Sequence, residues 1–226
     1  MSVREALAQV TERIAAAAKV AGRDPSSVRL VAVTKTHGPD VIREAYACGQ
    51  RAFGESYAQE LAEKAPALAD LADIEWHFIG HLQTNKAKVV AKHAHVVHTV
   101  HSAELAAELG KRVVAASRAP LPVLVEVKLS EEASKHGAAA ADLGALLDAI
   151  EKDARLRLRG LMTMPPLGDL DVARRTFEAL ASLRERHGGA ARLPELSMGM
   201  THDFETAIAC GATLVRIGTA IFGARV

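Results

Sequence analysis

A lysine at the end of an apolar segment is the residue of this chain best suited to covalent chemistry. Residues 30–33 are apolar without alternation, as expected of a parallel strand buried on both faces, and Thr34 and Lys35 follow directly. Because an ammonium beside a buried core is costly to desolvate, we expect the pKa of Lys35 to fall below its usual value of about 10.4. A neutral amine there could attack a carbonyl and form a Schiff base. The alternative is a lysine that extends from the strand end into solvent.

Two glycine-containing segments near the C-terminus could bind an anion. One runs from Ser197 through Met198 and Gly199 to Thr201, with two hydroxyls, and the other begins at Gly218 and Thr219 and ends at Gly223. Glycine lets a backbone approach an anion closely, and exposed N–H groups at the start of a helix bind phosphate. Either segment alone could simply end a strand. Both together, opposite a strand-end lysine, favour a phosphate site.

A lysine for an aldehyde and a cradle for a phosphate together predict pyridoxal 5'-phosphate (PLP) as a ligand. Arg216 precedes the second glycine segment by two residues, so it could approach the pyridine ring. An arginine beside the ring nitrogen would keep that nitrogen unprotonated and weaken the ring as an electron sink. Arg216 could instead pair with a carboxylate at the rim of the fold.

The elements that must position these residues alternate regularly between strand and helix. Eight strand candidates in 226 residues favour an α/β fold, a single closed (β/α)8 TIM barrel, over its rival, an open doubly wound sheet. A capping box at Ser2 and Glu5 begins an extra N-terminal helix, which could fill the gap after the last strand, where only a short segment follows. The strand candidates are residues 30–33, 52–55, 74–79, 96–100, 122–127, 158–162, 195–198 and 213–217, and a helix over 138–150 is expected after the fifth.

Composition predicts a soluble cytoplasmic protein with one domain over residues 1–226. Hydrophobic residues make up 49% of the chain, enough for a core, and the formal net charge of +1 offers no basic field for nucleic acid. Aromatic residues are 4%, which argues against base stacking. The N-terminus lacks the pattern of a signal peptide, and no segment approaches the roughly 18 apolar residues of a membrane span.

Cysteine and histidine usage gives no sign of a metal site. Cys48 and Cys210 each stand in the phrase Ala-x-Ala-Cys-Gly, where the glycine is expected to end a helix, so both are interpreted as packing residues. The histidines at 93, 95, 98 and 101 span a helix end, a loop and a strand. Since such a spacing cannot bring all four to one ion, we expect no metal.

Six motifs over nearly the whole chain resemble the pyridoxal phosphate homeostasis protein family. They are VTKT (33–36), FGESYAQE (53–60), WHFIGHLQTNK (76–86), GLMTMP (160–165), LSMGM (196–200) and VRIGTAIFGAR (215–225). The resemblance implies a barrel similar to the N-terminal domain of alanine racemase. It also implies carriers or regulators of PLP in vitamin B6 homeostasis rather than catalysts, with apo PLP-dependent enzymes as recipients and a monomeric state.

The resemblance assigns roles to individual residues. It implies a Schiff base between the cofactor and Lys35, phosphate contacts from the segment 197–199 and from Gly218 and Thr219, and Arg216 near the ring nitrogen. Ser56 stands where the family usually has asparagine, so its contact to the ring side of the cofactor is shortened or replaced by water. The chain also has His37 and Gly38 before Pro39, where the family commonly continues directly to proline.

Three other functions stay open at this point. A racemase would need a second base, which in alanine racemase is a tyrosine from another domain, whereas Tyr46 and Tyr57 are expected in helices. A cofactor-free aldolase would use Lys35 with Glu55 or His77 as acid–base partner. A protein that only senses the cofactor is compatible with the carrier hypothesis.

Overall fold

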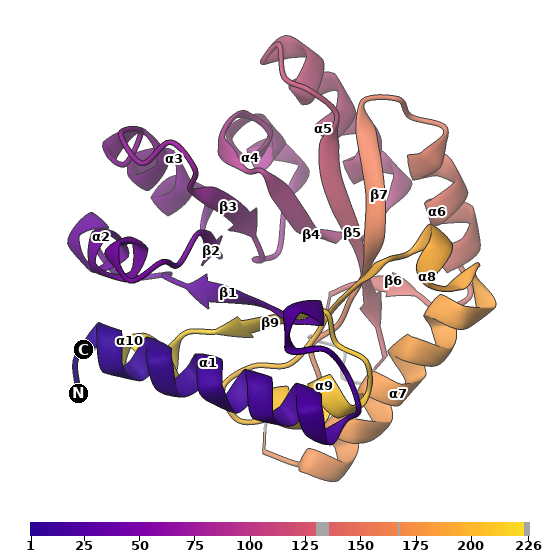
Figure 1. Cartoon of the computed structure of the whole chain (residues 1–226). Helices are drawn as coiled ribbons and strands as arrows, with labels where there is room; N and C mark the ends of the chain where they lie inside the picture. Colours follow the sequence, from indigo (N-terminus) through magenta and orange to yellow (C-terminus); the bar gives the residue numbers. More distant parts are fainter. Residues whose placement is uncertain (130–135, 167, 224–226) are drawn as a thin grey trace.

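Eight parallel strands close into a barrel in the computed structural model (Figure 1), which describes residues 1–129, 136–166 and 168–223. The hydrogen-bonded order is β4-β3-β2-β1-β9-β8-β7-β5, and pairing between β4 and β5 closes the ring. This confirms the predicted TIM barrel. Residues 224 and 225, which end the last family motif, lie outside the described ranges. The strands are β1 (Arg29–Val33), β2 (Ala52–Glu55), β3 (Glu75–Phe78), β4 (Val96–Val100), β5 (Leu121–Lys128), β7 (Leu156–Met162), β8 (Glu195–Ser197) and β9 (Leu214–Ile217).

Helices surround the barrel, and several begin at the caps that the sequence predicts. Ser2 and Glu5 form the expected capping box, and the Ser102 hydroxyl accepts the Leu105 N–H. Cys48 and Cys210 end two helices, each followed by a glycine with positive φ. The helices are α1 (Val3–Val20), α2 (Pro39–Ala47), α3 (Ala58–Ala67), α4 (Ala87–His93), α5 (Ala103–Ala115), α6 (Leu143–Glu151), α7 (Leu170–Arg186), α8 (Gly189–Arg192), α9 (Phe204–Ala209) and α10 (Thr219–Phe222), with 3-10 turns at Pro25–Ser27 and Thr84–Lys86.

The N-terminal helix completes the outer ring, as the sequence predicts. In its described part, to residue 223, the segment after β9 supplies the four-residue α10, which is too short to cover the barrel at that point. Helix α1 lies along this side and packs against α2, α9 and α10 (Figure 1). Its buried residues, Ala6, Leu7, Val10, Ile14 and Ala18, recur at helical spacing and form the face turned to the barrel.

One predicted element is wrong at its start. Residues 138–150 were expected to form a single helix, but Ala138–Ala139 form a short strand, β6, and α6 begins at Leu143. Val127 pairs with Ala138 in parallel register at the end of β5. Alanine favours helix locally, and here pairing with a neighbouring strand outweighs that preference.

The barrel encloses an apolar layer distinct from the core beneath the helices. Six buried side chains from different strands make this inner layer, namely Val31, Ala52, Val96, Leu124, Met162 and Leu214. Layers of side chains from alternate strands are the usual filling of such barrels. Polar residues of the same strands lie towards both ends of the layer, and the site residues are among them.

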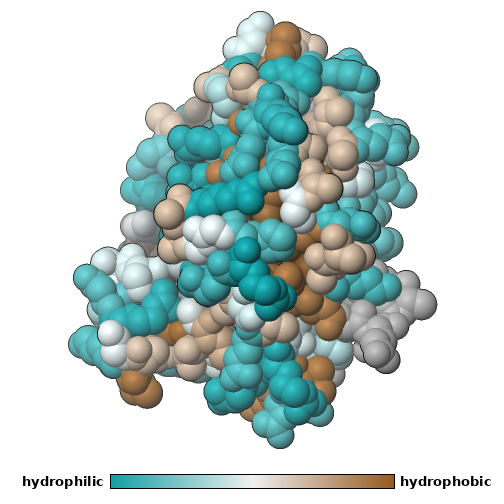
Figure 2. All heavy atoms as spheres, turned by 90° about the vertical axis from the view of Figure 1, so that its right-hand side faces the viewer, coloured by the Kyte–Doolittle hydropathy of each residue, from teal (hydrophilic) through white to brown (hydrophobic). Residues whose placement is uncertain are grey.

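The outer surface is mainly hydrophilic on the side that carries α6 and α7. Figure 2 shows this face, where hydrophobic atoms occur in small patches between hydrophilic ones. Among the described residues, no helix is both long and apolar enough to cross a membrane.

Candidate functional site

The barrel brings the predicted site residues to one end. Strands β2, β1, β9 and β8 are consecutive neighbours, and all run in the same direction. Ser56 follows β2, Lys35 follows β1 by two residues, and Gly218 and Thr219 follow β9. Ser197 is the last residue of β8. We call this end, where the strands finish, the carboxyl mouth.

The turn that carries Lys35 is held in a strained conformation. Thr36 has a φ of 68°, in the left-handed region that a β-branched residue rarely adopts. Its N–H donates to Glu60 Oε2 at 2.8 Å, and the His37 N–H donates to the Thr34 carbonyl at 3.0 Å. These two hydrogen bonds therefore hold the backbone of the turn. Lys35 itself is half-buried.

A buried ion-pair cluster that the sequence analysis missed supports this turn. The ammonium of Lys64, on α3, lies 2.8 Å from Glu55 Oε1, 2.5 Å from Glu60 Oε2 and 2.9 Å from the Thr34 carbonyl. Glu55 is fully buried, and burial raises its pKa to about 7 although Lys64 and Thr34 donate hydrogen bonds to it. The spacing of Glu60 and Lys64, four residues apart on a helix, was the available signal for this cluster. Through its bonds to Lys64 and Thr34, Glu55 therefore supports the turn.

The two glycine segments are pressed against their neighbours and leave backbone donors available. A Cβ on Gly218 would lie 3.0 Å from the Val33 carbonyl oxygen, and one on Gly199 would lie 2.6 Å from the Ala207 Cβ. The Arg216 N–H donates to the Gly199 carbonyl at 2.9 Å, which joins the segments. Within the described part of the chain, the N–H groups of Gly199, Gly218 and Thr219 donate no hydrogen bond.

The loops after β1 and β9 also touch through side chains. The ring centroids of His37 and Phe222 are 5.3 Å apart, so the loop that carries Lys35 packs on α10. Ser56, on the other side of Lys35, lies against Gly80, where a Cβ would be 1.9 Å from the Ser56 carbonyl oxygen. Only glycine fits at position 80 without moving Ser56.

Arg216 lies inside the barrel at the carboxyl mouth. Its guanidinium donates to Ser197 Oγ at 2.6 Å and to the Thr163 carbonyl at 3.0 Å, and it is 4% exposed. Burial lowers its pKa to about 10, with Asp203 and Glu126 acting in the opposite direction. Ser197 Oγ also lies 2.8 Å from His98 Nδ1, and the Met198 side chain belongs to the outer core. A phosphate contact from the Ser197 hydroxyl stays a prediction, and Gly199 supplies the N–H in that segment.

Glu126 is a buried carboxyl group without a full set of partners. It is 4% exposed on β5, and among the described residues its Oε2 has no hydrogen-bond partner. Burial raises its pKa to about 7, against the attraction of Arg216. The protonated form is thus favoured in the folded state relative to the unfolded chain.

The Glu126→Gln substitution should flatten the dependence of stability on pH. Because the folded-state pKa of Glu126 is raised, its stabilising contribution is complete below about pH 4.5 and is lost as the pH rises through about 7. Urea unfolding should show that the wild type loses roughly 2 kcal/mol more than the variant between pH 5 and pH 8. The exposed Glu12→Gln is the control. Parallel pH profiles for wild type and Glu126→Gln would contradict the assignment.

The histidines at 95, 98 and 101 lie in separate surroundings. His95 Nδ1 accepts the Trp76 N–H near the start of β4, whereas His98 lies in the barrel interior. His101 belongs to a different cluster of rings. Its ring centroid is 5.2 Å from that of His81, and the centroid of His81 is 3.6 Å from that of His136. In the described ranges no set of three or more His, Cys, Asp or Glu side chains is arranged to hold a metal ion.

Comparison with known proteins identifies the family. The model of the alanine racemase N-terminal domain matches residues 6–226. A pyridoxal phosphate homeostasis protein of Pseudomonas aeruginosa is 44% identical over 235 residues, which cover 99% of this chain and 96% of the relative. The chain belongs to the pyridoxal phosphate homeostasis protein family. The resemblance of its motifs is therefore confirmed, as is its relation to the alanine racemase N-terminal domain.

Solved structures of the family and of more distant proteins share the barrel. PipY of Synechococcus elongatus, solved with PLP bound, is 38% identical, with a TM-score of 0.81 over 95% of this chain and 100% of PipY. Alanine racemase of Corynebacterium glutamicum is 17% identical, with a TM-score of 0.64 over 96% of this chain and 61% of the racemase. This second likeness shows the fold alone.

Proposed function

We propose that this family member binds PLP at the carboxyl mouth as a Schiff base on Lys35 and serves in PLP homeostasis. The observation that carries the proposal is the contact between the two loops. Gly218 packs directly on Val33, at the end of the strand that leads to Lys35, and the N–H groups of Gly218 and Thr219 remain available beside it. An amine and an anion cradle thus occupy neighbouring strand ends, as a phosphorylated aldehyde requires.

The residues of the carboxyl mouth divide into those that would bind the aldehyde, the phosphate and the ring of PLP. When bound, PLP supplies an aldehyde carbon and a conjugated ring. Lys35 provides the amine, and the N–H groups of Gly199, Gly218 and Thr219 bind the phosphate. Arg216, a buried donor at the mouth, would lie near the ring nitrogen and would keep that nitrogen unprotonated. Ser56 contacts the ring side.

We propose a carrier or regulator rather than a catalyst. Two facts about relatives support this: proteins of nearly the same length as this chain bear the name pyridoxal phosphate homeostasis protein, and PipY was solved with PLP bound. The alanine racemases extend well beyond the part that this chain matches. We infer that the protein works as a monomer in the cytoplasm and passes PLP to apo forms of PLP-dependent enzymes.

The choice between PLP and pyridoxal tests the phosphate cradle. After incubation with either aldehyde and gel filtration, we expect about one PLP per chain and almost no pyridoxal, because the cradle contributes charge-assisted hydrogen bonds that a hydroxymethyl group lacks. Cofactor content is measured after release in alkali. Equal retention of both aldehydes would exclude a phosphate site, and retention of neither would overturn the proposed function.

A further inference from the structure

A continuous series of polar side chains crosses the interior of the barrel. It begins at the carboxyl mouth, where Arg216 donates to Ser197 Oγ at 2.6 Å. Ser197 Oγ lies 2.8 Å from His98 Nδ1, and His98 Nε2 lies 2.8 Å from His77 Nδ1. His77 Nε2 then lies 3.1 Å from Glu75 Oε1. We call these five residues the interior chain.

The interior chain runs beside the apolar layer rather than through solvent. Ser197 and His98 are fully buried, His77 is 1% exposed and Arg216 is 4% exposed. His77 pairs in register with Val96, a member of the apolar layer. Buried polar groups cost free energy unless each is hydrogen-bonded, so a chain of this length inside a barrel core needs a compensating role.

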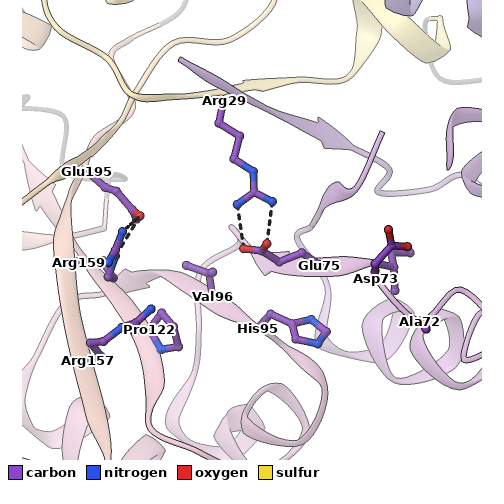
Figure 3. Close-up of a pocket in the computed structure, with 11 residues that line it drawn as sticks. Arg29, Ala72, Asp73, Glu75, His95, Val96, Pro122, Arg157, Arg159 and Glu195 are labelled. Carbon is purple, nitrogen blue, oxygen red and sulfur yellow. Dashed lines mark hydrogen bonds and ion pairs between the residues drawn. The ribbon is translucent and has the colours of Figure 1, made fainter. Parts of the chain in front are cut away.

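The other end of the interior chain, Glu75, lines a cavity at the opposite end of the barrel. The amino ends of the strands surround a cavity of about 510 Å³, the amino-terminal mouth. Figure 3 shows Arg29 reaching across it to Glu75, with its guanidinium 2.7 and 3.1 Å from the two carboxylate oxygens. Arg159 and Glu195 form a separate ion pair in the same cavity, at 2.6 Å. Glu195, like Glu75, is a carboxylate paired with an arginine in this cavity, but it does not belong to the interior chain, so it can serve as a control for Glu75.

The chemistry of the two ends limits the directions of the bonds between them. Arg216 can only donate, so Ser197 Oγ accepts from it. Glu75 is a carboxylate to which Arg29 donates two hydrogen bonds, so it can only accept. For neutral imidazoles, one order has Ser197 donate to His98 Nδ1 and His98 Nε2–H donate to His77 Nδ1. Because Ser197 Oγ can accept two hydrogen bonds, the reverse order, with both of these bonds turned round, is also available at this step.

The last contact decides between this order and its reverse. In the reverse order, the lone pair of His77 Nε2 would face the Glu75 carboxylate. In the first order, His77 Nε2–H points to it, and the carboxylate attracts this N–H mainly by charge, since the contact falls outside hydrogen-bond geometry. Both histidines are then Nε2–H tautomers.

We propose that Glu75, held by Arg29 at the amino-terminal mouth, sets the tautomers of His77 and His98 and thereby positions Arg216 for the cofactor. Glu75, His77 and His98 are positioning residues that act through Ser197. The tautomers depend only on this chain, whereas the effect on the cofactor rests on the proposed function. The opposite ends of the barrel are thus energetically coupled.

Nitrogen NMR of the cofactor-free protein tests the first half. Proton–nitrogen correlation spectra of the imidazoles should show His77 and His98 each as a single Nε2–H tautomer. In Glu75→Leu the carboxylate that attracts His77 Nε2–H is gone, so the Nδ1–H tautomers of His77 and His98 should appear. Glu195→Leu should keep the wild-type pattern. A wild-type His98 in the Nδ1–H form, or identical spectra for both variants, would overturn the inference. The wild-type spectrum decides even if a variant fails to fold.

The rate of PLP release tests the second half. A coupling near the lower end of the usual range predicts about fivefold faster release from Glu75→Leu and an unchanged rate from Glu195→Leu. Glu75→Gln, which keeps the shape of the side chain but not its charge, should release PLP about as fast as Glu75→Leu. Altered tautomers with unaltered release would overturn the coupling. A wild type that retains no PLP would overturn the proposed function and the coupling with it. The tautomers seen by NMR would still test the proposed directions of the hydrogen bonds in the interior chain.

Discussion

The Lys35→Ala variant is expected to lose covalent retention of PLP completely while keeping its barrel. Lys35 lies in a turn after β1 whose backbone is held by hydrogen bonds from the N–H groups of Thr36 and His37. Its removal should therefore cost less than about 1 kcal/mol in free energy of unfolding. Intact mass after borohydride reduction should show the pyridoxyl adduct in the wild type and none in the variant.

A second lysine at the carboxyl mouth controls for non-specific reaction. Lys128 ends β5, on the far side of the ring of strands from β1, and is also half-buried. Lys128→Ala should keep the full adduct. If Lys35→Ala still carries a reduced adduct in the same yield, Lys35 is not the residue that forms the Schiff base. Matching thermal unfolding of both variants would show that the loss is chemical.

The largest loss of stability is expected from Lys64→Met. The substitution keeps the length of the side chain but leaves Glu55, which is fully buried, without its cation. Removing one partner of a buried ion pair typically costs about 3–5 kcal/mol. The Thr34 carbonyl, one residue before Lys35, also loses its donor. PLP retention should weaken along with stability.

The pH dependence of this loss identifies its cause. Glu55 already has a raised pKa of about 7, and loss of Lys64 removes an interaction that lowers it. Glu55 is therefore protonated at pH 5 in the variant, so urea unfolding should show a smaller loss at pH 5 than at pH 8. The exposed Lys88→Met is the control, with a change within about 0.5 kcal/mol. An equal loss at both pH values would show that packing, and not the uncompensated carboxylate, is responsible.

The strands and their order followed from the sequence because their burial is visible in it. Residues 30–33 are apolar without alternation, as a parallel strand buried on both faces requires, and they lie within β1. The error at Ala138 arose because two alanines pair with β5, a contact that local propensity does not contain. The carboxyl mouth was predictable from the topology, because the carboxyl ends of the parallel strands of a barrel all lie at the same end of it.

The contacts across the barrel could not be predicted in the same way. Which residue of β3 meets which residue of β4 or β8 depends on the stagger of the strands, so the contact between His77 and His98 had no sequence signal. The bonds of the Ser197 hydroxyl to Arg216 and His98 likewise had no sequence signal, and its contact with a phosphate stays a prediction. One domain over residues 1–226 and a monomeric state stay predictions.

The absorption spectrum of the purified protein loaded with PLP, before and after borohydride, tests the central claim most directly. We predict a visible band that reduction bleaches, and peptide mass mapping should then find the pyridoxyl group on Lys35. A band that reduction does not change, or a pyridoxyl group mapped to another lysine, would contradict the proposed Schiff base at the carboxyl mouth.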